Sequence, residues 1–103
     1  MDLAEFQLSQ KKSTPPPGLS FALQALWYEA KGDWDKSHEL AQKDDGPAGN
    51  WVHAYLHRKE GDTSNARYWY NQAAKPVYTG SLDDEWTAIA EELLEAREKF
   101  WRY

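Results

Sequence analysis

Hydrophobic residues recur at helical spacing along most of the chain, and short polar, Gly or Pro segments interrupt them. The pattern predicts five helices, at about 19–31, 34–43, 50–60, 63–74 and 81–101. Gly32 and Gly61 follow the first and third helices, and we expect both in the left-handed conformation that ends a helix. The first helix is apolar on nearly every side, which predicts a central position. The last has an apolar stripe, and we expect solvent to cover its acidic face.

A short pattern occurs twice in this series of helices. The segment 26–33 (LWYEAKGD) recurs 29 positions later as 55–62 (YLHRKEGD). Each copy places a Gly-Asp stop between two helical runs and so forms a helical hairpin, which buries its apolar face by stacking on a neighbour. The sequence therefore predicts an all-α fold in one domain at 19–103. Its parts are hairpins at about 19–43 and 50–74 and a C-terminal capping helix at about 81–101.

Residues 1–18 form an arm that precedes this domain. Its three consecutive prolines, at 15–17, are followed by Gly18; they exclude a helix there and predict an extended tether. Phe6 is the residue best suited to anchor the arm on the domain. The pattern leaves two alternatives open, an arm docked through Phe6 and a disordered arm.

Composition limits the class of protein. The chain has 103 residues, enough for one small domain, and its apolar content is largely aromatic, with six Trp and six Tyr. It has no cysteine, which excludes disulfides and thiolate chemistry. No stretch approaches the roughly 18 apolar residues of a membrane helix, and the N-terminus does not resemble a signal sequence. We therefore expect a soluble cytoplasmic protein that does not bind a membrane.

The net charge of −5 is unevenly distributed. Residues 1–50 carry eight acids and five bases (−3), residues 51–80 two acids and four bases (+2), and residues 81–103 seven acids and three bases (−4). An acidic chain without a basic stripe does not favour nucleic acid, whose binding depends on neutralising phosphates. The positive second hairpin is compatible with a local anionic ligand.

The segment 30–37 (AKGDWDKS) resembles the middle of a tetratricopeptide repeat (TPR), in which a Gly-Asp or Gly-Asn turn precedes an aromatic and then a small residue. Ala25 and Ala54 match the family's small residue before the turn. The second copy has His57 and Thr63 where the family has aromatic residues, and the spacing of 29 is shorter than the usual 34. The resemblance implies a TPR-like fold of two hairpins and a terminal helix.

A second resemblance covers about residues 20–101. The segments 51–58 (WVHAYLHR) and 65–70 (NARYWY) are similar to those of small bacterial helical proteins of this kind. This resemblance implies no established activity. TPR-like folds imply a binding role by analogy alone.

The three histidines of the chain are expected to point inward. On a helical wheel His57 lies about 40° from His53, whereas Arg58 and Lys59 lie toward the opposite side of the same helix. Charged side chains are rarely buried unpaired, so both histidines should face the interior or a concave groove. His38 lies at the edge of the buried stripe of its own helix.

Three interpretations of these histidines follow, in decreasing order of preference. The first is a core in which the imidazoles are hydrogen-bonded to neighbouring polar groups. The second is a ligand-binding groove lined by His53, His57, Asn65, Arg67 and Tyr68. The third is a metal site at His38, His53 and His57, in which the i, i+4 pair on one helix needs a third ligand, His38 or Glu60, from the fold.

Other chemistry is weakly represented. The adjacent acids at 83–85 and 91–92 point in different directions on a helix, so they make poor general acid–base pairs. The leading hypothesis is a non-enzymatic binding or scaffolding module that recognises a peptide or protein through the groove of the third and fourth helices, without cofactor or metal. The alternative is a small-molecule or metal-binding protein, or an enzyme, that uses the inward-facing histidines.

Overall fold

The computed structural model describes the backbone of residues 1–101 and the side chains of residues 1–97. It contains six helices: α1 (Leu3–Ser9), α2 (Phe21–Ala30), α3 (Trp34–Lys43), α4 (Pro47–Lys59), α5 (Thr63–Gln72) and α6 (Leu82–Trp101). No strand occurs within residues 1–101, so the all-α prediction is confirmed. None of the helices in this range is long and apolar enough to cross a membrane.

The two predicted hairpins are formed by α2 with α3 and by α4 with α5. Gly32 and Gly61 adopt positive φ angles of +88° and +85°, as the repeat predicted. Asp33 and Asp62 follow them as N-caps, and each carboxylate accepts a hydrogen bond from the backbone N–H three residues on. The same local device thus ends one helix and starts the next in both copies.

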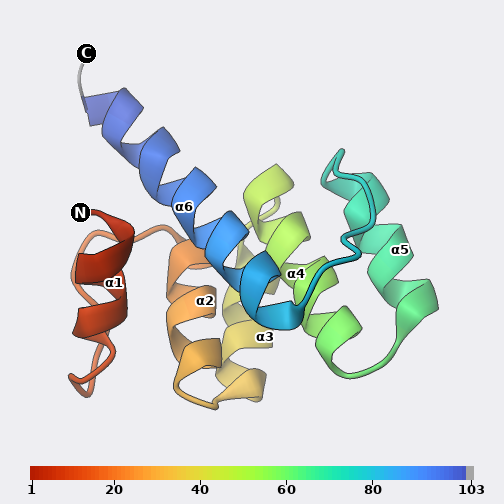
Figure 1. Ribbon diagram of the computed structural model, residues 1–103, viewed down its shortest axis with the longest axis horizontal. Coiled ribbons are helices and arrows are strands. Elements are labelled where there is room, and N and C mark those ends of the chain that lie inside the picture. Colours follow the sequence, from red (N-terminus) through yellow and green to blue (C-terminus); the bar gives the residue numbers. More distant parts are fainter. Residues whose placement is uncertain (102–103) are drawn as a thin grey trace.

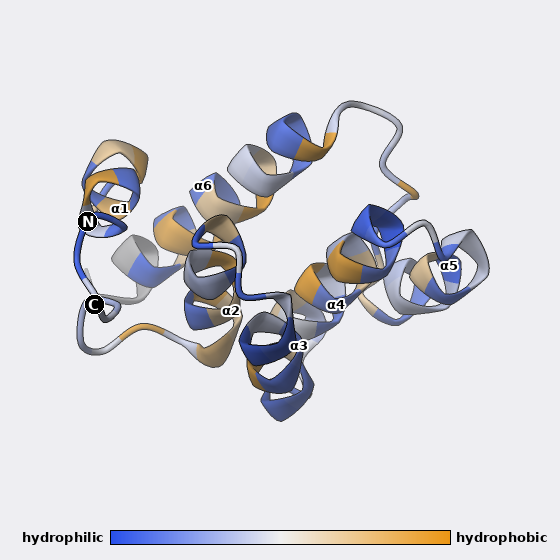
Figure 2. Cartoon of the chain, turned by 90° about the horizontal axis from the view of Figure 1, so that it is seen from below, coloured by the Kyte–Doolittle hydropathy of each residue, from blue (hydrophilic) through white to orange (hydrophobic). Residues whose placement is uncertain are grey.

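The helices pack in layers around α2 and α4. These two helices lie between α6 on one side and α3 on the other, with α5 packed against α4 (Figure 2). In Figure 1, α6 crosses over the hairpins, and α1 lies at the left edge of the molecule. Because α4 contacts α2, α3, α5 and α6, it is at least as central as α2, to which the sequence assigned that place.

Three helix boundaries differ from the predicted ones by two or three residues, and the first is the start of α2, which lies at Phe21 rather than near residue 19. α4 starts at Pro47 rather than near residue 50, because Pro at the first helical position has no N–H to leave unpaired. α5 ends at Gln72 rather than near residue 74, and Ala74 adopts a left-handed φ of +56°. The changes in α4 and α5 lie at interruptions between helices that the sequence did identify.

The N-terminal arm is docked, and it contains a helix that the hydrophobic pattern did not predict. Asp2 and Glu5 form a capping box at the start of α1. Phe6 is completely buried, and its ring stacks on Trp86 of α6 with 5.8 Å between centroids. Of the two alternatives for the arm, the structure shows the one anchored by Phe6.

The acidic side of α6 is not wholly solvated, and the expectation for it is wrong at Glu85. This side chain has no exposed surface. Its Oε2 accepts hydrogen bonds from Trp51 Nε1 (3.3 Å) and the Tyr70 hydroxyl (2.5 Å), and its Oε1 pairs with Arg58 at 3.0 Å. The physical reason is position, since Glu85 lies one turn before the buried Ile89 on the inner side of α6.

Candidate functional site

The three histidines lie together where α3 packs against α4. The ring centroids of His38 and His53 are 4.7 Å apart, those of His53 and His57 4.8 Å, and those of His38 and His57 5.5 Å. One ring nitrogen from each histidine lies within 4.8 Å of the others. Three imidazoles from two helices therefore share one small volume, which we call the histidine cluster.

The helix α4 positions two members of the cluster one turn apart on one face. His53 is 5% exposed and His57 8% exposed, so both point inward as the helical wheel predicted. His38 comes from the middle of α3 and is partly exposed at the edge of the cluster. Only the packing of α3 on α4 brings it to the other two.

Two tryptophans enclose the histidine cluster. Trp34, the first residue of α3, stacks on His38 with 4.8 Å between ring centroids and 12° between planes. Trp69 of α5 stacks on His53 at 3.9 Å and 18°. Trp69 is partly buried and forms one wall of the cluster. These flat rings restrict the orientations of His38 and His53 and limit the access of water.

Among residues 1–97, Glu60 is the acid whose carboxylate hydrogen-bonds to the cluster, and it does so at one histidine. Oε1 of Glu60 lies 2.6 Å from Nδ1 of His57, so Nδ1 carries a hydrogen and donates it to the carboxylate. Neither His38 nor His53 has a hydrogen-bond partner in the part of the chain whose side chains are described. The first interpretation, a hydrogen-bonded core, therefore has a protein partner only at His57.

Burial and mutual repulsion lower the pKa values of two members of the cluster, His38 and His53. Burial, with smaller contributions from the neighbouring His38 and His57, lowers the pKa of His53 to about 4. Burial is also the largest cause that lowers the pKa of His38, followed by His57. At neutral pH the imidazoles of His38 and His53 are therefore neutral, and each has a nitrogen lone pair available.

A groove of about 460 Å³ adjoins the cluster, above α4 and between the C-terminal end of α3 and α5. His53, Tyr68 and Trp69 form its aromatic side. Asp44 and Asp45 lie at its other end, in the loop before α4. The side chain of Tyr68 is 55% exposed and lies beside the partly buried Trp69.

The five residues predicted to line a groove are only partly brought together. His53 and Tyr68 line the groove just described, whereas His57 lies in the histidine cluster. Asn65 hydrogen-bonds to Asp62 at the start of α5, and Arg67 is exposed outside the lining. Sequence reasoning missed the two acids of the groove, because a loop residue has no place on a helical wheel.

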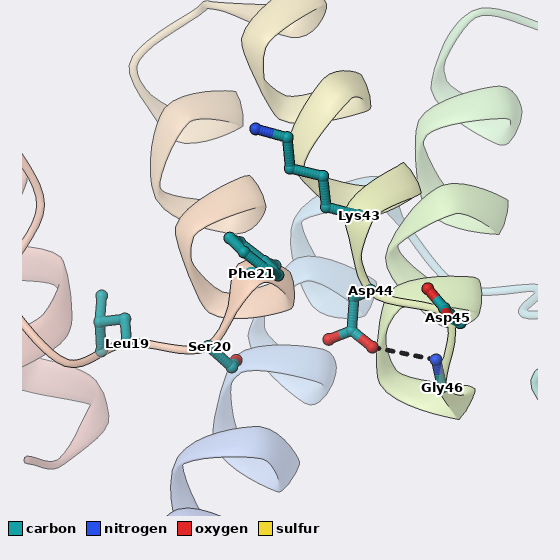
Figure 3. A pocket seen from close by; sticks show the side chains of 7 residues that line it. All are labelled: Leu19, Ser20, Phe21, Lys43, Asp44, Asp45 and Gly46. Carbon is teal, nitrogen blue, oxygen red and sulfur yellow. Dashed lines mark hydrogen bonds between the residues drawn. The ribbon is translucent and has the colours of Figure 1, made fainter.

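A second, larger pocket of about 550 Å³ lies between the start of α2 and the end of α3 (Figure 3). It shares Asp44 and Asp45 with the groove, and three of its polar contacts are local. Ser20 caps α2, Asp44 accepts a hydrogen bond of 3.1 Å from the Gly46 N–H, and Lys43 pairs with Glu39 at 3.7 Å. Figure 3 shows Phe21 at the start of α2 and Lys43 at the end of the neighbouring α3. The pocket has no group of converging polar atoms, so we place the functional site at the cluster and the groove.

No protein-family model, curated protein or solved structure matches this chain.

Proposed function

We propose that the protein is a non-enzymatic binding module that recognises a peptide segment of a partner protein in the groove between α3 and α5. The observation that carries the proposal is the exposed Tyr68 beside the partly buried Trp69, at the side of a groove with a helical floor. Aromatic residues of this kind supply most of the binding energy at many protein interfaces, because they bury a large area with few rotatable bonds.

The repeated hairpin supports the same proposal. Ala25 and Ala54 are buried at equivalent positions before the two turns, and Ser37 and Ala66 are buried after them. In the first hairpin the hydroxyl of Ser37 donates a hydrogen bond of 2.6 Å to the carbonyl of Ala25. Small residues at these places let paired helices approach closely, as in a TPR-like hairpin. Stacks of such hairpins present concave surfaces that bind extended segments.

The charges of the groove define the kind of peptide. Asp44 and Asp45 line it, and it has no lysine or arginine in its lining. The amide side chains of Gln42, Asn50 and Gln72 also line it and suit the backbone groups of a bound peptide. We therefore propose a segment with a lysine or arginine next to an apolar residue, rather than the anionic ligand suggested by the charge of 51–80. The chain has no cysteine and so needs no oxidising compartment, and we propose that its partner is a cytoplasmic protein.

The experiment is a binding screen by fluorescence polarisation with a positional-scanning library of labelled hexapeptides. We expect enrichment of lysine or arginine beside an apolar residue. Tyr68→Ala should weaken binding of the selected peptides at least tenfold, and Asp45→Asn should weaken it and reduce its dependence on salt.

The matched control is Phe21→Ala, which removes an exposed aromatic residue from the other pocket. It should leave peptide binding unchanged, and all three variants should keep the wild-type circular dichroism spectrum. A library without sequence preference, or equal binding by Tyr68→Ala and the wild type, would contradict the proposal.

A further inference from the structure

We propose that His38, His53 and His57 bind one divalent transition-metal ion, with zinc as the best match, and that Glu60 is a positioning residue for His57. The proposal rests on the contacts between α3 and α4. It does not require a peptide in the groove, so it stands or falls separately from the binding function.

The first argument is the supply of donor atoms. His53 is 5% exposed and has no hydrogen-bond partner among the described side chains, so no protein donor occupies the lone pair of its imidazole. His38, partly exposed, also has none. A metal ion between the rings would use the lone pairs of both.

The second argument is the pairing of His57 with Glu60. Because the Nδ1–H of His57 donates to Glu60 at 2.6 Å, the lone pair of this imidazole lies on Nε2. Histidines that bind metals commonly have such a carboxylate on the second ring nitrogen, where it sets the tautomer and makes the ring more basic. Glu60 is thus placed to prepare His57 for an ion without touching the ion.

The third argument is distance. Three imidazoles bound to one tetrahedral zinc at about 2.0–2.1 Å have ring centroids roughly 5 Å apart. The three observed centroid separations are 4.7, 4.8 and 5.5 Å. The donor nitrogens, now within 4.8 Å of one another, must approach to about 3.4 Å, which rotation of the side chains can supply.

The fourth argument concerns the class of ion. Three neutral nitrogen donors suit zinc, copper, nickel and cobalt, whereas calcium and magnesium require oxygen ligands. A three-histidine set leaves one position of a tetrahedral ion for water or another small ligand. Trp34 and Trp69 enclose the remaining sides with aromatic surface.

The test is isothermal titration of the tag-free chain, stripped with EDTA, with zinc chloride. The chain has only three histidines, so histidine-dependent binding reports on this cluster alone. We expect saturation at one ion per chain and a higher melting temperature with zinc than with EDTA. Cobalt should show the strong visible absorption of a tetrahedral nitrogen site.

The variants separate a metal site from a structural stack of rings. His38→Ala, at the most exposed member of the cluster, should keep the helical circular dichroism spectrum and lose at least tenfold in zinc affinity. Glu60→Gln should lose about 10–100-fold in zinc affinity without changing the melting temperature of the EDTA-treated chain. Glu39→Gln, an exposed acid next to His38, is the matched control and should bind zinc as the wild type does.

Two results would overturn the proposal. One is the absence of saturable zinc uptake near one ion per chain. The other is uptake that His38→Ala leaves unchanged, which would place the ion on surface carboxylates.

Discussion

The hydroxyl of Tyr70 on α5 donates a hydrogen bond of 2.5 Å to the carboxylate of Glu85 on α6, and both side chains are fully shielded from solvent. Burial raises the pKa of Tyr70, and the hydrogen bond to Glu85 raises it further, so the phenol stays protonated. Arg58 of α4 neutralises the same carboxylate at 3.0 Å. One buried acid therefore links the second hairpin to the last helix.

Removal of this acid should strongly destabilise the fold. Glu85→Ala leaves the buried Tyr70 hydroxyl and Trp51 indole N–H without their partner and removes one of the two acceptors of Arg58, and we expect a loss of about 3–5 kcal/mol in the free energy of unfolding. Urea denaturation at pH 7 measures it. The control is Glu92→Ala, which removes an exposed partner of Lys75 at 2.9 Å and should cost less than about 1 kcal/mol. Equal costs for the two variants would show that Glu85 is not buried.

Trp27 and Trp69 should differ in their contribution to stability. Trp27 has no exposed surface, so Trp27→Ala should cost about 3–5 kcal/mol. Trp69 is partly buried and packs on His53 at 3.9 Å, so Trp69→Ala should cost clearly less. Thermal and urea unfolding of both variants provide the comparison. A larger loss at Trp69 would be incompatible with its position at the edge of the groove.

Acidification should destabilise the metal-free chain through the histidine cluster. The pKa of His53 is about 4 in the folded state against 6.5 in the unfolded chain, so protons bind the unfolded state more strongly. Protonation of His53 therefore does not affect the free energy of unfolding above pH 6.5. It lowers this free energy as the pH falls toward 4, by at most about 3 kcal/mol. His38 on α3 and His57 on α4 are the titratable groups that face His53, while Trp69 on α5 carries no charge.

The measurement is the free energy of unfolding in urea with EDTA, taken at steps between pH 7.5 and pH 5. His53→Gln removes the titrating ring and should flatten this part of the curve. A wild-type curve that is already flat over this interval would show that the folded chain accepts a proton at His53 without cost.

Local signals were sufficient for the hairpins. A positive φ at Gly32 and Gly61 and a cap at Asp33 and Asp62 depend on a few neighbouring residues, so the repeat located them correctly. The inward direction of His53 and His57 also follows from one helix alone. These features need no knowledge of how the helices pack.

Long-range packing determined the features that the sequence did not show. In the sequence Glu85 is one of many acids on the last helix, and its partners come from α4 and α5. The helix α1 is docked because Trp86 of α6 lies opposite Phe6 and Trp27 of α2 donates a hydrogen bond to Ser9. The groove acids and the meeting of His38 with the other histidines likewise depend on how α3 and α4 are placed.

The contact between Phe6 and Trp86 has a consequence for the order of events on the ribosome. The two rings are 86 − 6 = 80 positions apart, so the docking surface for α1 is incomplete until most of the chain has been synthesised. The hairpins α2–α3 and α4–α5, by contrast, use contacts close in sequence and can form as they emerge. The N-terminal helix, although made first, should therefore be among the last to reach its native position.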